Sequence, residues 1–189
     1  MNIFYLHKDP ETAAQMHVDK HCVKMILETC QLLSTAHRVL DGELYYYKNR
    51  NGRKSKTWYL PDEREALLYS ATHINHPSAV WARHSNSNYM WLHQLLLELC
   101  REYTYRYGKV HKCEAIGLVN ELRFIPKNIP IGEFTEPTPA MPDKYKIKGD
   151  SVQSYRNYYN GEKQRMFSWK QRPVPEFINM TIGENYAAI

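Results

Sequence analysis

Side chains that can transfer protons recur at helical spacing within the first forty residues. The row holds two imidazoles, an ammonium and a carboxylate, followed by an amide, a hydroxyl and a guanidinium: His17, His21, Lys24, Glu28, Gln31, Thr35 and Arg38. Steps of three and four residues place such side chains along one line of a helix, where neighbours touch. A carboxylate one turn from an ammonium can pass a proton or stabilise a cation. We therefore expect Glu28, His21 and Lys24 to form the functional centre; the alternative is a solvated helix face with an ordinary ion pair.

The same row permits two further kinds of chemistry. An amine forms an imine more readily when neighbouring cations depress its pKa, and Lys20, Lys24 and Arg38 are such neighbours. His17 and His21, four residues apart, also have the spacing of two metal ligands on one helix, which would suit a metal-dependent hydrolase. The glutamate that serves metalloprotease helices as general base is missing between them, so we assign no metal and expect no cofactor.

A second stretch combines cations with aromatic rings. Residues 45–59, YYYKNRNGRKSKTWY, contain no acidic residue and five basic ones: Lys48, Arg50, Arg53, Lys54 and Lys56. Cations bind phosphates and rings stack on unpaired bases, so this composition is typical of a nucleic-acid contact loop. The Asn51-Gly52 pair predicts a hairpin turn within it. A solvated hairpin whose tyrosines pack inward is the alternative interpretation.

The elements that must position these residues are mostly helical. Residues 9–41 predict one long core helix, which begins at Asp9-Pro10 and ends at Asp41-Gly42. Further helices are expected over about 62–73, from Pro77, from Ser85 or Asn86 to Gly108, over about 112–122, and from Asp150 to Gly161. The sequence therefore predicts a mainly α protein: a single compact helical domain with a small possible β-hairpin and a Pro-rich extended arm packed on it.

Composition suggests how the chain is organised. It has 189 residues, 43% of them hydrophobic, which is enough to bury the core of one domain. Residues 125–148 contain five prolines, which argues against a helix there. We expect residues 1–124 to form the helical core, and residues 125–189 to form the Pro-rich arm and a C-terminal helix packed on it, with both parts in one domain overall.

Charge and targeting signals bear on partners and location. The formal net charge is +5, and the four cysteines form no C-x-x-C pair, so we expect reduced core thiols. No signal peptide and no apolar run of about 18 residues is present, so no membrane partner is expected. These features favour a cytoplasmic protein.

Several blocks of the sequence resemble a known family. The segment Asp19–Glu28, DKHCVKMILE, has the form Asp-x-His-x6-Glu and resembles the catalytic helix of the pyrimidine-dimer DNA glycosylase family, the phage endonuclease V type. Asn75-His76-Pro77 with Trp81, Asn88-Tyr89 and Leu92 is similar to the broader group placed with that family, and residues 154–163, SYRNYYNGEK, resemble its aromatic-basic C-terminal stretch. The Asp-Lys-His helix and residues 106–111, RYGKVH, also resemble phage proteins.

This resemblance implies an all-α enzyme that acts on a damaged or modified pyrimidine in DNA. In the family, the N-terminal α-amine attacks the sugar C1′, and a helix glutamate supports the imine and the later β-elimination. Carried over to this chain, the amine is that of Met1 and the glutamate is Glu28, with His21 organising the site and Lys24 beside it. A phage-encoded protein of this kind would work in the host cytoplasm.

The remaining candidate residues are those that would contact DNA or a nucleotide: His17, Lys20, Gln31, Arg38, Lys48, Arg50, Arg53, Lys54, Lys56, His76, Arg106, Lys109, His111, Tyr155 and Arg156. A non-catalytic nucleotide- or DNA-binding phage protein is the first alternative function. A metal-dependent hydrolase that uses His17 and His21 is the second.

Overall fold

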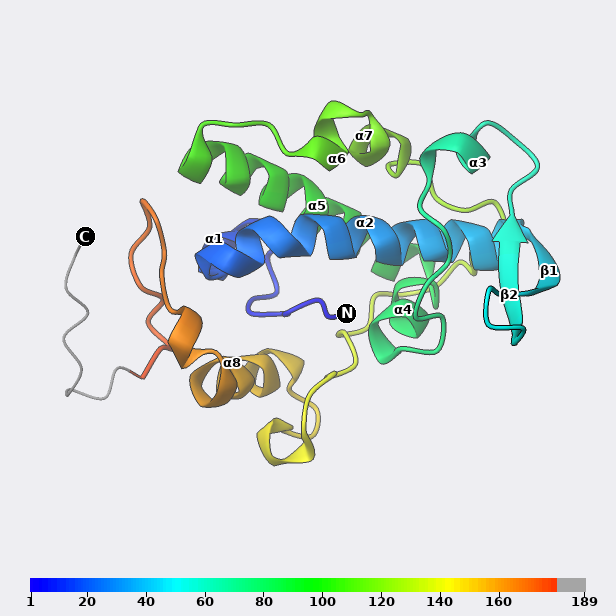
Figure 1. The fold of residues 1–189 in the computed structure, drawn as a ribbon. Coiled ribbons are helices and arrows are strands. Elements are labelled where there is room, and N and C mark those ends of the chain that lie inside the picture. The colour runs from blue at the N-terminus through cyan, green and yellow to red at the C-terminus, as the bar shows by residue number, and fades with distance from the viewer. Residues whose placement is uncertain (180–189) are drawn as a thin grey trace.

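The structure, a computed structural model, describes residues 1–179. It is mainly α-helical, as the sequence predicts, with a two-stranded antiparallel sheet (Figure 1). The helices are α1 (Pro10–Met16), α2 (Asp19–Asp41), α3 (Arg64–Leu67), α4 (Pro77–Ala82), α5 (Asn86–Tyr107), α6 (Lys112–Ala115), α7 (Leu118–Glu121) and α8 (Ser151–Glu162); the strands are β1 (Glu43–Lys48) and β2 (Lys54–Tyr59). Single 3-10 turns lie at Asp143–Tyr145 and Gln164–Met166. Within the described residues, no helix combines the length and the hydropathy needed to cross a bilayer.

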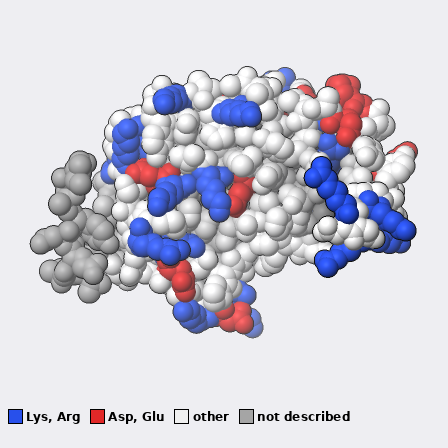
Figure 2. Space-filling view, in the orientation of Figure 1, with Lys and Arg blue, Asp and Glu red and all other residues white. Residues whose placement is uncertain are grey.

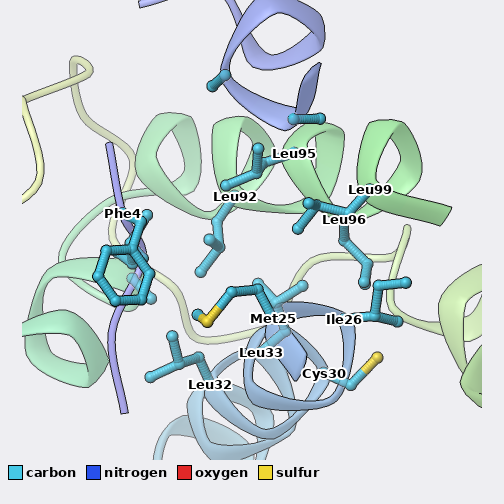
Figure 3. Packing of buried hydrophobic residues seen from close by; sticks show 14 of the residues in the cluster. Phe4, Met25, Ile26, Cys30, Leu32, Leu33, Leu92, Leu95, Leu96 and Leu99 are labelled. Carbon is cyan, nitrogen blue, oxygen red and sulfur yellow. The ribbon is translucent and has the colours of Figure 1, made fainter. Parts of the chain in front are cut away.

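The hydrophobic core lies between the two longest helices, α2 and α5, which run antiparallel (Figure 1). Figure 3 shows Leu92 and Leu96 of α5 facing Met25 and Ile26 of α2, and all four side chains are at most 1% exposed. Burying a side chain of this kind stabilises the fold by about 1.5–3 kcal/mol. The four cysteines are buried free thiols, as the sequence predicts.

The prediction of one continuous helix over residues 9–41 is wrong at one point. The backbone is extended at His17 and Val18, which separate α1 from α2. Arg106 of α5 donates hydrogen bonds to the carbonyl oxygens of Gln15 and His17 at this break. Because a distant side chain satisfies these carbonyl groups, the chain can leave the helix here without burying unpaired polar atoms.

The helix expected over about 62–73 is much shorter in the structure, where α3 covers four residues. Side chains of α2 form hydrogen bonds with the backbone that follows α3. Arg38 donates to the carbonyl oxygen of Leu68, and the Thr35 hydroxyl accepts the N–H of Thr72. These contacts replace helical hydrogen bonds, so the segment follows the surface of α2 as irregular chain.

Glycines mark two other helix boundaries. Gly117 has a φ of +83°, and it divides the helix expected over about 112–122 into α6 and α7. The long helix α5 follows its prediction, since the Ser85 side chain caps its start and Gly108, with a φ of +63°, ends it. Asp150 caps α8, as predicted. The hairpin is also confirmed, with Gly52 at its turn.

Residues 123–142 contain no helix or strand. They are tied to α4 and α5: Trp81 Nε1 donates to the carbonyl oxygen of Thr135, and the Ser85 hydroxyl donates to that of Glu133. Buried residues beyond position 125 belong to the same hydrophobic cluster as α2 and α5, among them Ile129, Tyr155, Tyr159 and Trp169. The division of the chain at residue 125 stays a prediction, and residues 180–189 of its second part lie outside the described residues.

Candidate active site

Three of the four predicted catalytic residues lie together around one carboxylate. The Met1 amine nitrogen is 3.6 Å from Glu28 Oε2, and the Lys24 ammonium is 3.0 Å from Glu28 Oε1. The backbone N–H of Asn2 donates to Glu28 Oε2 over 3.0 Å. Glu28 is 8% exposed, whereas the Lys24 side chain is 66% exposed. A nearly buried carboxylate is therefore held between an α-amine and an ammonium.

The position of the amine is set by the segment that carries it. Residues 1–8 pass between α2 and α8 (Figure 1), and Ile3, Tyr5 and Leu6 are at most 1% exposed. The Asn2 side chain donates to the carbonyl oxygen of Ala140 over 2.9 Å and accepts the N–H of Ile3 over 2.8 Å. Asn2 was not predicted as a site residue because its partner lies 138 positions away, and no local pattern indicates that contact.

His21, the fourth predicted catalytic residue, packs against this segment. Its Nδ1 lies 2.7 Å from the Tyr159 hydroxyl, and its ring stacks on Phe4 with centroids 4.2 Å apart. Burial lowers the pKa of His21 to about 3, helped by the nearby cationic or imidazole groups of His17, Lys163 and Lys24. The imidazole is therefore neutral at pH 7. Its contacts hold Phe4, whose φ of +55° is costly for a residue other than glycine.

His76 lies close enough to the Met1–Glu28 pair to respond to its charges. Burial lowers the pKa of His76, and the N-terminal amine lowers it further, while Glu28 opposes this shift. Its Nδ1 accepts the N–H of Ser78 at the start of α4, so the neutral ring carries its proton on Nε2. His76 thus belongs to the electrostatic surroundings of the amine and the carboxylate, although the sequence predicted it only as a nucleic-acid contact.

Tyr158 and Lys163 are further side chains of this region, although neither is among the predicted site residues. Lys163 Nζ donates to the Tyr158 hydroxyl over 3.2 Å and lies 4.5 Å from the centroid of the same ring. It is also 5.9 Å from the ring centroid of Phe4. The aromatic-basic composition of residues 154–163 was the signal that could have identified both.

Four predicted nucleic-acid contacts are interior residues, and we withdraw them. His17, Arg38, Arg106 and Tyr155 are at most 4% exposed. Arg106 bonds to Glu102 and Asp19, and Arg38 bonds to Glu65 and to backbone carbonyl groups. Their donors are occupied within the fold, so these guanidinium groups are structural. Helical spacing placed His21 to Arg38 in one row of α2, but His17 lies before the helix break, and spacing did not reveal which members of the row another element covers.

The other predicted contacts remain accessible to different degrees. Exposed cations are found in the hairpin, in α2 and just after α5: Lys48, Arg50, Arg53, Lys54, Lys56, Lys20 and Lys109. Gln31, His76, His111 and Arg156 are half-buried. His111 caps α6, since its ring accepts the N–H of Cys113, and Arg156 donates to the carbonyl oxygen of Leu6. Figure 2 shows basic side chains over α2 and over the hairpin on one face.

The pair His17 and His21 does not have the geometry of two metal ligands on one helix. His17 lies at the end of α1 and His21 in α2, on opposite sides of the helix break. His17 Nδ1 bonds to the carbonyl oxygen of Ala13 over 2.7 Å. Within residues 1–179, no group of three or more His, Cys, Asp or Glu side chains is arranged to hold a metal ion.

Comparisons with models of protein families, with curated proteins and with solved structures find no match to this chain. The site therefore has to be interpreted from its own geometry.

Proposed function

We propose that the protein is a DNA-directed enzyme of the glycosylase/lyase type that acts on a damaged or modified pyrimidine. The observation that carries the proposal is the position of the Met1 amine, 3.6 Å from the nearly buried carboxylate of Glu28. The proposal takes Met1 as the N-terminal residue of the mature protein, which an intact-mass measurement checks. The resemblance of residues 19–28 to a glycosylase helix assigned the same two groups.

The chemistry begins with the amine as nucleophile. The Met1 amine lies against the nearly buried Glu28, whereas the Lys24 side chain is largely exposed to solvent, which favours Met1 over Lys24 as the nucleophile. The nitrogen attacks the sugar C1′, the bond from C1′ to the base breaks, and the base leaves with the electron pair and takes up a proton. Opening of the sugar ring then gives an imine between C1′ and the Met1 nitrogen.

Glu28 has two roles in this scheme. Its carboxylate stabilises the positive charge of the iminium, because it lies against the nitrogen that bears this charge. It also serves the β-elimination, in which a proton leaves C2′ and the C3′–O bond breaks, with the phosphate departing with the electron pair. Water then hydrolyses the imine and restores the amine. Lys24 holds the second carboxylate oxygen.

The finer features of the fold fit this function. We infer that the chain is one compact domain, with the Pro-rich residues 125–148 lying over it as an arm. The contact from Asn2 to Ala140 makes that arm a support for the reactive terminus. The enzyme would act in the cytoplasm, in that of the host if a phage encodes it.

A non-catalytic DNA-binding protein is the second candidate, because the exposed basic hairpin accounts for DNA affinity without chemistry. The two candidates differ in what they require of Glu28. Only the enzyme needs its carboxylate.

Strand cleavage at an abasic site tests the proposal without knowledge of the base. A duplex with one abasic site supplies the C1′ aldehyde directly, and a panel of duplexes with modified pyrimidines then identifies the base released. We expect Glu28→Gln to slow cleavage by about 100-fold or more, in the range found for lost acid–base or electrostatic groups.

Glu98→Gln is the matched control. Glu98 is also 8% exposed and also pairs with an exposed cation on its own helix, Arg101. Its removal should change the cleavage rate less than twofold. Equal rates for wild type and Glu28→Gln would contradict the enzyme proposal and leave the binding protein.

A further inference from the structure

The β1–β2 hairpin has two chemically different faces. Strand pairing sets them, because alternate residues of a strand point to opposite sides and paired residues point to the same side. One side, the tyrosine face, consists of Glu43, Tyr45, Tyr47, Ser55, Thr57 and Tyr59. The other side, the lysine face, consists of Leu44, Tyr46, Lys48, Lys54, Lys56 and Trp58. All the lysines of the two strands therefore lie on one face, and the single carboxylate lies on the other.

Side-chain contacts agree with this division. On the tyrosine face, the Tyr45 hydroxyl donates to Glu43 over 2.7 Å, and the rings of Tyr45 and Tyr59 lie 5.2 Å apart. On the lysine face, Lys54 Nζ is 4.3 Å from the ring centroid of Tyr46. Lysine and aromatic side chains thus form a mixed surface on the second face.

The cations of the hairpin have no carboxylate to neutralise them. Within residues 1–179, none of Lys48, Lys54 and Lys56 forms an ion pair, whereas Lys8, Lys24, Lys127, Lys144 and Lys146 do. The turn adds Arg50 and Arg53, both exposed and likewise outside the ion pairs of the described residues. Unpaired cations at this density favour an anionic partner.

The exposed aromatic rings of the hairpin do not contribute to the hydrophobic core. Every residue of β1 is exposed, including Tyr46 at 60% and Tyr47 at 51%. The hairpin is attached at its base, where Arg38 of α2 donates to the carbonyl oxygen of Trp58, and it projects from the end of α2 (Figure 1). Basic side chains cover its projecting part in Figure 2. The aromatic and basic residues are therefore displayed to solvent instead of being packed into the core.

We propose that the lysine face and the turn of this hairpin bind double-stranded DNA. A two-stranded β-ribbon fits the major groove, where lysines reach phosphates and rings lie against sugars and base edges. The hairpin begins about 20 Å along α2 from Glu28, as the helical rise of 13 residues implies. A duplex that runs along α2 from Glu28 would therefore reach the hairpin. This inference rests on the proposed function for its DNA partner, but it does not depend on the proposed reaction.

The salt dependence of duplex binding tests the proposal. The variant Lys48→Gln/Lys54→Gln/Lys56→Gln, measured by fluorescence anisotropy with a 20-base-pair duplex in about 50–200 mM NaCl, should bind at least tenfold more weakly. The slope of log K against log salt should become shallower by about 2 to 3, because each phosphate contact contributes about 0.9. Because all three positions are exposed, we expect the variant to fold, and circular dichroism checks this.

Two controls distinguish an effect of the lysine face on affinity from effects of net charge and of a disturbed hairpin structure. Lys8→Gln/Lys127→Gln/Lys144→Gln removes the same charge from lysines that already pair with carboxylates, and should change affinity less than twofold. Tyr46→Ala and Tyr47→Ala alter neighbouring exposed tyrosines on opposite faces. Tyr46→Ala should weaken binding several-fold, whereas Tyr47→Ala should have almost no effect.

Several outcomes would overturn the proposal. These are no duplex binding by the wild type, an equal loss of affinity in the two triple lysine variants, or an equal loss of affinity in the two tyrosine variants. Tighter binding of a single strand than of the duplex would also overturn it. None of these outcomes depends on Glu28, so cleavage assays with Glu28→Gln distinguish failure of this surface from failure of the active site.

Discussion

At the scale of single residues, burial decides which role each imidazole can have. Burial lowers the pKa of His17 to about 4, that of His21 to about 3 and that of His37 to about 4. His37 Nδ1 accepts a hydrogen bond from Arg64, so the neutral ring carries its proton on Nε2, where it meets the Tyr89 hydroxyl. All three rings are neutral at pH 7, and they act as packed hydrogen-bonding groups within the fold.

These buried imidazoles predict a specific loss of stability in mild acid. Their ordinary pKa is about 6.5, so below that pH the unfolded chain binds protons that the folded chain does not. The free energy of unfolding should therefore fall as the pH drops from about 6.5 towards 4, by up to about 1.4 kcal/mol per pH unit for each ring. Urea unfolding at several pH values from 7.5 to 4.5 measures this slope.

His21→Gln isolates one of these contributions. Glutamine retains a hydrogen bond to Tyr159 but does not titrate, so the slope between pH 6.5 and 5 should decrease. Aspartates contribute little in this window, because their ordinary pKa of about 3.9 leaves them almost fully ionised above pH 5 in the unfolded chain as well; in the fold, the hydrogen bond to Arg64 lowers the pKa of Asp62 to about 2. A flat stability profile in the wild type, or an unchanged slope in His21→Gln, would contradict the assignment of His21 as a buried neutral ring.

Some features of the site could be predicted from the sequence and others could not. Glu28 and Lys24 are neighbours because helical spacing makes them so, and the resemblance to the glycosylase helix pointed to Met1. The burial of Arg38 was not visible, because it depends on the irregular chain after α3 covering that side of α2. Spacing along one helix places side chains in a row, but it does not say which neighbour covers them.

At the scale of elements, Arg38 organises the chain after the hairpin. Its guanidinium donates to Glu65 and to the carbonyl oxygens of Trp58, Leu68 and Tyr69. Trp58 belongs to β2 and Glu65 to α3, whereas Leu68 and Tyr69 lie in the irregular chain that follows α3. One side chain therefore fixes the base of the hairpin and the irregular segment that follows α3.

Arg38→Met should consequently destabilise the fold by about 3–5 kcal/mol, because it leaves several polar groups without their donor. Arg38→Lys should recover only part of this loss, since an ammonium cannot reach the same set of acceptors. Arg50→Met is the control at an exposed position and should change stability by at most about 0.5 kcal/mol. Urea unfolding measures all three, and a change below about 1 kcal/mol for Arg38→Met would show that the segment is held by other contacts.

Element boundaries were predictable where the signals are local. The Ser85 and Asp150 caps and the left-handed Gly108 mark their helix ends in the sequence itself. The break between α1 and α2 was not predictable, since apolar periodicity continues through it. Its cause is Arg106, which reaches back 89 positions to the carbonyl oxygen of His17.

At the scale of the whole molecule, the candidate active site and the basic hairpin occupy different parts of α2. The Met1–Glu28 pair lies along the first half of this helix, supported by Ala140 and by α8 through Tyr159. The hairpin follows its last residue (Figure 1). The helix α2 thus connects a proposed site of chemistry with a proposed site of DNA anchorage.

The most direct test of the central claim is to trap the imine and locate it. Incubating the protein with an abasic-site duplex and sodium borohydride reduces an imine to a stable amine, and mass spectrometry of peptides identifies the modified nitrogen. We predict one adduct on the α-nitrogen of Met1, and none when the N-terminus is acetylated or extended by two residues. An adduct on a lysine such as Lys24, or no adduct with an intact Met1 amine, would contradict the assignment of Met1 and Glu28 as the reactive pair.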